Sequence, residues 1–343
     1  MNAVFSPTCQ LTLGSQQWTN QILRLEIELC AAPGINVLRA ILPSAAPFSA
    51  AEGDAAELTL NSGDTESAVF TGTIDSVRRW ESGIEITALD AGGVMARFRP
   101  ATTYEHVTAS SVVQSLASDA GADCGSLDNG ADLSYYVADP ARTAWEHVAR
   151  LAAWSGALAT VSADNKIESK VVQTTAADFA LRYGREILAI EHTKRAAPVA
   201  SFTVAGESGT GSASSPDARK AVTDFFAGNR PDGPSATAIW EWEPALRTSS
   251  AAATAGSARL RAYGSARDAG KLTAILLPQA RPGAVMEMQD ATGGLPAGPV
   301  WIRRVRHSVT GGRALTTVWF AGSGDASGAS LLGSAASAIG GLL

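Results

Sequence analysis

The sequence predicts a fold of the α+β class that is mainly β, with runs of short strands on both sides of a helical segment. Three observations lead to this prediction. Apolar and polar residues alternate repeatedly over residues 1–97, as in half-buried strands. Two amphipathic helices follow between residues 108 and 156. A hairpin pattern near residue 75 then returns near residue 303, as an internal repeat.

Length and composition fit a folded protein. The 343 residues suffice for two to four compact units; 45% are hydrophobic and 17% charged. A net charge of −6 disfavours sequence-specific nucleic-acid binding. Cys9, Cys30 and Cys124 form no CxxC pair, which argues against a disulfide framework or zinc site. We expect synthesis in the cytoplasm, because we find no signal peptide or apolar span of about 20 residues.

The first strands are read from alternation. Leu25, Ile27 and Leu29 are separated by glutamates, and the patterns INVLRAIL and AELTLN follow. A β-hairpin runs from Phe70 to Ala88, with its turn at Glu81–Gly83. Five or more short strands favour a small barrel or sandwich, although a generic β domain has the same pattern.

The helices are marked by their ends. Thr108 is the expected N-cap of a helix that stops at Gly121. The run RTAWEHVARLAAWSG predicts a second helix that stops at Gly156. A hairpin turning at residues 163–166 follows.

The internal repeat aligns two hairpins. Ile74 aligns with Ile302 and Val77 with Val305, and the basic pairs at 78–79 and 306–307 coincide. Any twisted hairpin shares this pattern, so the repeat alone leaves open whether two barrels of one design are present. Strand alternation points neighbouring arginines to opposite faces, so we expect the basic clusters to form salt bridges between barrels rather than a phosphate-binding face.

The middle of the chain resembles the phage tail hub, or baseplate hub, family, which includes late control protein D and the hub portion of type VI secretion spike proteins. The resemblance is carried by FTGTID, TTYEHVTASSVVQSLASDAGA, Tyr135–Tyr136 and TAWEHVARLAAWSGALATVSADNKI, about a third of the chain in the same order. It implies two similar small β-barrel tube domains with an intervening α/β domain and an insertion. The expected divisions are a first barrel at 1–97, the α/β domain at 98–170, a second barrel at 171–205 and 271–322, the insertion at 206–270 and a tail at 323–343.

Several expectations concern the later segments. The second barrel would take strands around Ile187 and Phe202, with a turn at Pro282–Gly283. The insertion would contain a helix of small residues ending at Gly270. In the WEWE run of residues 240–243, the tryptophans are expected to act as a packing clamp rather than a sugar platform. The tail is expected to contact a partner through five apolar residues, Leu331, Leu332, Ile339, Leu342 and Leu343.

The sequence carries no catalytic motif that we recognise, and we expect no catalytic residues, cofactor or metal. The four histidines are scattered, and each is expected to be a packing or surface residue; His147 is the least improbable exception.

The resemblance implies a structural hub: a homotrimer that joins a six-fold tail or injection tube to a three-fold central spike. Its partners would be the tail tube protein and the spike, with tape measure and baseplate wedge proteins as further candidates, in a virion tail tip or an extracellular tail-like particle. The alternatives are a tail-associated peptidoglycan hydrolase and a carbohydrate-binding tail adhesin. Whether the particle is a phage, a bacteriocin or another injection system, contractile or not, stays open.

Overall fold

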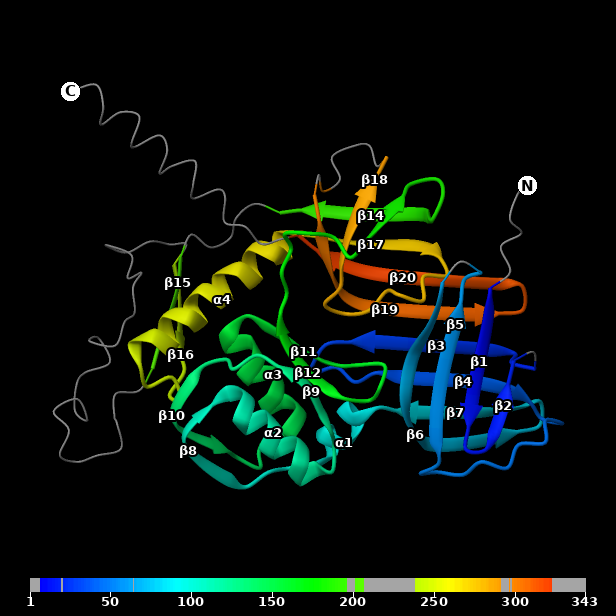
Figure 1. The fold of residues 1–343 in the computed structure, drawn as a ribbon, viewed down its shortest axis with the longest axis horizontal. Coiled ribbons are helices and arrows are strands. Elements are labelled where there is room, and N and C mark those ends of the chain that lie inside the picture. Colours follow the sequence, from blue (N-terminus) through cyan, green and yellow to red (C-terminus); the bar gives the residue numbers. More distant parts are fainter. Residues whose placement is uncertain are drawn as a thin grey trace.

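The computed structural model describes residues 7–19, 21–63, 65–195, 201–206, 238–290, 296 and 298–322. This part of the chain is mostly β, as predicted, and contains four helices. Figure 1 shows a large sheet running across the top and right of the molecule, with the helices gathered on the left. No helix in the described ranges is long and apolar enough to cross a membrane.

The first unit consists of strands with alternating burial. In β3, Leu25, Ile27 and Leu29 are buried and face a shared apolar core, while the intervening glutamates face the other side of the sheet. The predicted hairpin is confirmed as β6 and β7, with Trp80 opposite Gly83 at its turn. The strands are β1 (Thr8–Leu13), β2 (Gln16–Trp18), β3 (Arg24–Cys30), β4 (Val37–Pro43), β5 (Ala55–Asn61), β6 (Glu66–Trp80) and β7 (Gly83–Leu89).

The helical unit has its own core, built around two capped helices. The predicted cap is confirmed, because Thr108 accepts a hydrogen bond from the Ser111 amide. The structure adds a second cap, in which Thr143 forms a capping box with Glu146. Both helices end at a left-handed glycine, Gly121 or Gly156. The elements are α1 (Ala91–Arg97), β8 (Thr102–Thr108), α2 (Ala109–Ala120), β9 (Cys124–Leu127), β10 (Asp132–Ala138), α3 (Ala144–Ser155), β11 (Ala157–Val161) and β12 (Ile167–Val171).

The last part of the chain returns to the sheet after an interruption. The returning strands are β13 (Phe179–Arg182), β14 (Ile187–Lys194), β17 (Asp268–Ile275), β18 (Val285–Gln289), β19 (Val300–Thr310) and β20 (Arg313–Ala321). Between β14 and β17 lie β15 (Ser201–Ala205), β16 (Ala238–Trp242) and α4 (Ser249–Arg267). The turn expected at Pro282–Gly283 lies between β17 and β18, with Gly283 at a φ of 87°.

The repeat is confirmed in the strand pairing. The order β3-β4-β7-β6-β5 in the first unit matches β14-β17-β20-β19-β18 in the second, with every neighbouring pair antiparallel. Both hairpins contain an irregularity at the same place, between Ile74 and Ser76 in β6 and between Ile302 and Arg304 in β19. A shared hairpin twist would not reproduce five strands and a bulge, so the two units have one design.

The two units are not separate sheets. β3 pairs with β19 over Arg24–Cys30, which joins both units into one 13-stranded sheet over a continuous apolar core. The helical unit is tied to the same place, because the Ala32 amide donates to the Ala159 carbonyl at 2.8 Å and the Trp145 indole donates to the Gly34 carbonyl at 2.6 Å.

Three expected boundaries need correction. Residues 91–97 form α1, whose Met95 packs in the core of the helical unit rather than in the first barrel. Phe202 of β15 is buried in that same core, because β15 pairs with β16 and packs against α4 instead of joining the large sheet. The helix of small residues ends at Arg267 rather than Gly270, because Asp268 already pairs with Lys194 in β17.

Candidate functional site

The joint between β3 and β19 is the most distinctive polar arrangement of the described sheet. Arg306 lies opposite Glu28 in the strand register, and its guanidinium contacts the Glu28 carboxylate at 3.0 Å and the Glu26 carboxylate at 3.4 Å. Arg304 forms a further ion pair with Glu28. Paired charges across neighbouring strands stabilise their register. The expected salt bridges between barrels are therefore confirmed for Arg304 and Arg306, whereas Arg78 of the other basic cluster contacts Glu85 of its own hairpin.

Trp319 of β20 lies beside these arginines. The Arg304 guanidinium carbon is 4.8 Å from its ring centroid, and that of Arg306 is 5.8 Å away. Such contacts hold a guanidinium in one orientation while leaving its N–H groups free for carboxylates. The joint thus combines backbone pairing, ion pairs and an aromatic support.

Charges recur at equivalent positions in the two units. Following the paired registers, Glu26 corresponds to Glu191, Arg39 to Lys271, and Arg78 to Arg306. In both units the acidic residue lies directly opposite the basic residue of the next strand: Glu26 opposite Arg39, and Glu191 opposite Lys271. The duplication has therefore kept the polar face of the sheet as well as its core.

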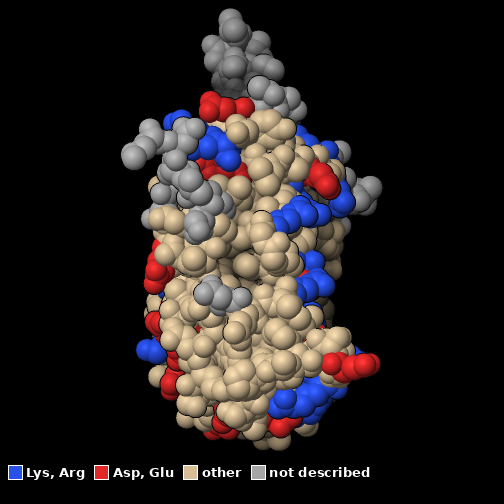
Figure 2. Space-filling view, turned by 90° about the vertical axis from the view of Figure 1, so that its right-hand side faces the viewer, with Lys and Arg blue, Asp and Glu red and all other residues tan. Residues whose placement is uncertain are grey.

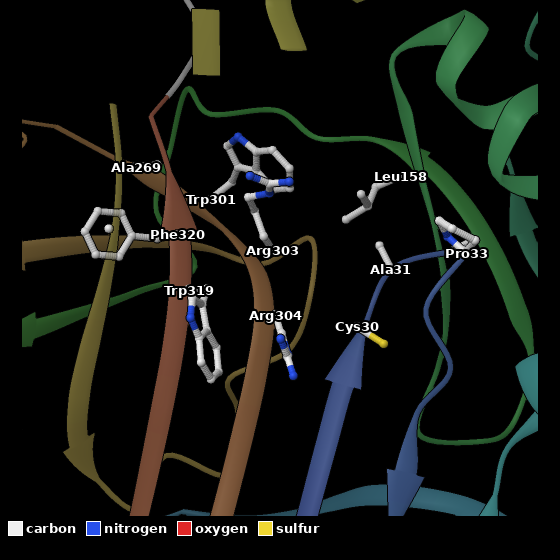
Figure 3. Close-up of a pocket in the computed structure, with 12 residues that line it drawn as sticks. Cys30, Ala31, Pro33, Leu158, Ala269, Trp301, Arg303, Arg304, Trp319 and Phe320 are labelled. Carbon is white, nitrogen blue, oxygen red and sulfur yellow. The ribbon is translucent and has the colours of Figure 1, made fainter. Parts of the chain in front are cut away.

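A cavity of about 460 Å³ opens at one end of the joint, between the sheet and the helical unit. Figure 3 shows Trp301 and Arg303 of β19 on one side of it, and Leu158 and Pro33 on the other. Burial raises the pKa of the lining thiol, Cys30, to about 12, and Glu28 and Asp90 act in the same direction. Cys30 is therefore a protonated thiol with little nucleophilic character.

His147, the histidine set apart in the sequence, has a partner at each ring nitrogen. His147 is buried, with Nδ1 2.6 Å from the Tyr136 hydroxyl and Nε2 3.0 Å from the Asp139 carbonyl oxygen. Burial lowers the pKa of His147, so the neutral ring donates from Nε2 and accepts at Nδ1. It is a satisfied core histidine. In the part of the chain that the structure describes, no three His, Cys, Asp or Glu side chains group as metal ligands.

The WEWE run does not form the expected packing clamp. Its tryptophans, Trp240 and Trp242, are 47% and 51% exposed. The glutamates face the protein instead: Glu241 pairs with Arg259 at 2.8 Å, and the buried Glu243 binds Arg150. The strand period of two places both carboxylates against helices, so both indoles face outward.

The five tail residues predicted to contact a partner lie outside the described residues. So does the remainder of the segment from residue 323 onward. Figure 2 shows the side of the molecule over the N-terminal strands, where charged side chains lie along the rim and the broad centre carries few. This side lacks the continuous basic area that phosphate binding needs.

Sequence reasoning missed the joint itself. Its arginines were expected to bind carboxylates, but the partner strand was not identified. The available signal was the matching spacing of opposite charges: Glu26 and Glu28 are two residues apart, and so are Arg304 and Arg306. Long-range strand pairs have no local pattern that selects one partner among several, which is why only the fold revealed it.

No family profile and no curated protein matches the sequence. Solved structures do match. The tail protein from Neisseria meningitidis MC58 has a TM-score of 0.72 at 14% identity, covering 93% of this chain and 98% of that one. The 43 kDa tail protein of prophage MuSo2 from Shewanella oneidensis has a TM-score of 0.67 at 16% identity, covering 93% and 99%.

A third similar structure comes from a secretion system. The c3393 protein of E. coli, described as a type VI secretion component with structural similarity to the phage T4 tail proteins gp27 and gp5, has a TM-score of 0.61. The identity is 13%, and the match covers 90% of this chain and 76% of that one. The fold resemblance predicted from the helical segment is confirmed: this chain has the fold of phage tail proteins and of a type VI secretion component.

Proposed function

We propose that the chain is a structural hub of a phage tail tip or tail-like particle, where three copies join a six-fold tail tube to a three-fold central spike. The observation that carries the proposal is the duplication: each chain contributes two units of one strand order, with matching bulges and charges. Three such chains present six similar units, which satisfies both symmetries. The similar structures place the fold among tail proteins.

The proposed partners follow from this proposed role. The tail tube protein would meet the six units, and the spike would meet the three-fold side. Tape measure and baseplate wedge proteins are further candidates. Assembly would take place in the bacterial cytoplasm, and the finished particle would carry the protein at its tail tip. The proposed role is structural; the buried, neutral His147 and the protonated Cys30 are not assigned a part in catalysis.

The test is the mass and symmetry of the assembled protein. Mass photometry of the purified full chain should show a species of three 35.3 kDa chains. Averaged end-on images of that species should show six similar densities around the axis. A chain that stays monomeric in assembled particles, or a ring without pseudo-six-fold order, would overturn the proposal.

The adhesin alternative has one observation in its favour, the two half-exposed indoles of β16. Exposed tryptophans at alternate strand positions can stack on sugar rings. Glycan-array binding that is lost in Trp240→Ala and Trp242→Ala would support this function, and an array without binding would remove it.

A further inference from the structure

Among the described strands of the large sheet, β14 and the end of β6 are long edges that no other described strand covers. β14 pairs only with β17. β6 pairs with β5 as far as Thr73, but its segment Ser76–Trp80 pairs only with β7. The edges also bear exposed apolar side chains, since Leu188 is 53% exposed and Trp80 is 39% exposed. Natural proteins usually protect such edges, so both are candidates for pairing with another chain.

The inner joint of the chain provides a template for that pairing. By the repeat, β19 corresponds to β6 and β3 corresponds to β14. In the middle of the sheet, the β19 edge of the second unit is covered by β3 of the first unit. The two outer edges, β14 and β6, are therefore equivalent to the two strands that pair at the inner joint, β3 and β19. Within one chain they lie apart, separated in the sheet order by β17, β20, β19, β3, β4 and β7.

We propose that β14 of one copy adds antiparallel to the β6 segment Ser76–Trp80 of a neighbouring copy, continuing the sheet from chain to chain. The register follows from the template. The pair Arg306 and Glu28 maps onto Arg78 and Thr193, and the pair Ser308 and Glu26 maps onto Trp80 and Glu191. The proposal rests on the proposed function only for the number of copies that close the ring.

The charges of the two edges are complementary in that register. The Arg306 guanidinium contacts the Glu26 carboxylate in the template, and their equivalents are Arg78 and Glu191. The Arg78 side chain is 79% exposed, with its nearest described carboxylate, that of Glu85, 4.0 Å away. A glutamate from a second copy would therefore lie diagonally across from a largely solvated arginine.

The side chains that point toward the core explain why the proposed β14–β6 joint can form between separately folded chains. In the template, buried Ile27 faces buried His307. Their equivalents are His192 and Arg79, which are more polar; Arg79 is exposed, and His192 is partly buried beside Asp268. The outer joint buries less apolar surface, so it suits association between folded chains rather than folding of one chain.

The contact is head-to-tail, because each copy offers a β14 edge and receives on a β6 edge. Such a heterologous contact gives a closed ring when the rotation between units divides the circle, and an open filament otherwise. The step that relates the two units within one chain is the same step that would relate the second unit of one chain to the first unit of the next. With two units in each chain, a six-unit ring closes at three chains.

Paired cysteines test the register. Arg78→Cys with Thr193→Cys places two thiols directly opposite across the joint, within disulfide reach. Ser76→Cys with Glu191→Cys uses the same strand faces but is four residues out of register, about 13 Å. In full-length protein under mild oxidation, the first pair should give covalent dimers and trimers on non-reducing gels. The second pair should give no more than the native chain with its three cysteines.

Charge reversal tests the edge independently. Arg78→Glu should weaken chain association about tenfold or more, because like charges would face each other. Adding Glu191→Arg should restore it to within about threefold of the native chain. Arg313→Glu, the same change on an exposed arginine away from both edges, is the matched control.

The outcomes separate the two proposals. A trimer in which neither cysteine pair links, or both link equally, overturns this joint and leaves the hub in place. The same holds for a trimer that Arg78→Glu does not weaken. A chain that is monomeric at every concentration overturns the joint and the hub trimer together.

Discussion

Replacing His307 by glutamine should remove a large part of the acid sensitivity of this protein. His307 is fully buried in β19, and its Nδ1 lies 2.9 Å from the Thr316 hydroxyl oxygen. The same hydroxyl accepts the Leu277 amide at 2.8 Å, so its own proton points to Nδ1. Protonating Nδ1 would break this arrangement inside an apolar core, and it would leave a buried charge.

The magnitude follows from the pKa difference between folded and unfolded states. Burial lowers the pKa of His307 from 6.5 to about 4, and Arg281 acts in the same direction. Between these two values the unfolded chain binds a proton that the folded chain does not. Stability is therefore present at neutral pH and lost as the pH falls. From pH 7.5 to pH 4.5 this one group should lower the free energy of unfolding by about 2.5 kcal/mol.

The assay is urea denaturation followed by tryptophan fluorescence, at several pH values between 7.5 and 4.5. His307→Gln can differ from the native chain in stability at pH 7.5 without affecting the argument, because only the change with pH is compared. The native chain should lose about 2.5 kcal/mol more than the variant over this range. Equal losses in the two proteins would show that His307 is protonated in the folded state, and would refute the reasoning.

Three other predictions concern separate parts of the molecule. Asp90→Asn should act in the opposite direction. Burial raises the pKa of Asp90 from 3.8 to about 7, so as the pH falls from 7.5 to 4.5 this group raises the free energy of unfolding of the native chain by about 3 kcal/mol. Urea denaturation of the variant should lack that increase. Gly270→Ala should destabilise the chain by about 1 to 3 kcal/mol in thermal or urea denaturation, because an added Cβ would lie 2.4 Å from the Glu191 carbonyl oxygen; a neutral effect would contradict that packing. Deleting residues 328–343 should leave the unfolding transition unchanged but reduce particle yield, and full yield would show that the tail is not used.

Local features were readable from the sequence because they depend on neighbours in the chain. The helix bounded by Thr108 and Gly121 was predicted from a capping residue, an apolar stripe and a glycine stop, and it has all three in the structure. The alternation of Leu25, Ile27 and Leu29 with glutamates likewise predicted a half-buried strand. The repeat was visible because a duplicated hairpin keeps its spacing even where most residues have changed.

The segments that were misassigned lacked such local signals. Phe202 and Val204 alternate as in any strand, and nothing in the run shows whether the strand joins the large sheet or packs under a helix. In the WEWE run, the strand period of two does not predict whether the tryptophans or the glutamates face the protein. Burial of the Glu243–Arg150 pair decided it, and this pair joins residues far apart in the chain.

The sequence by itself determined the mainly β class, the two helices between residues 108 and 156, the hairpins and the existence of a repeat. Only the tertiary structure decided that the two units share one sheet, that Arg306 meets Glu28 across the β3–β19 joint, and that β6 and β14 keep the matching edges. The physical reason is that strand pairing is selected by burial and complementarity over the whole fold, whereas caps, turns and alternation are selected within a few residues.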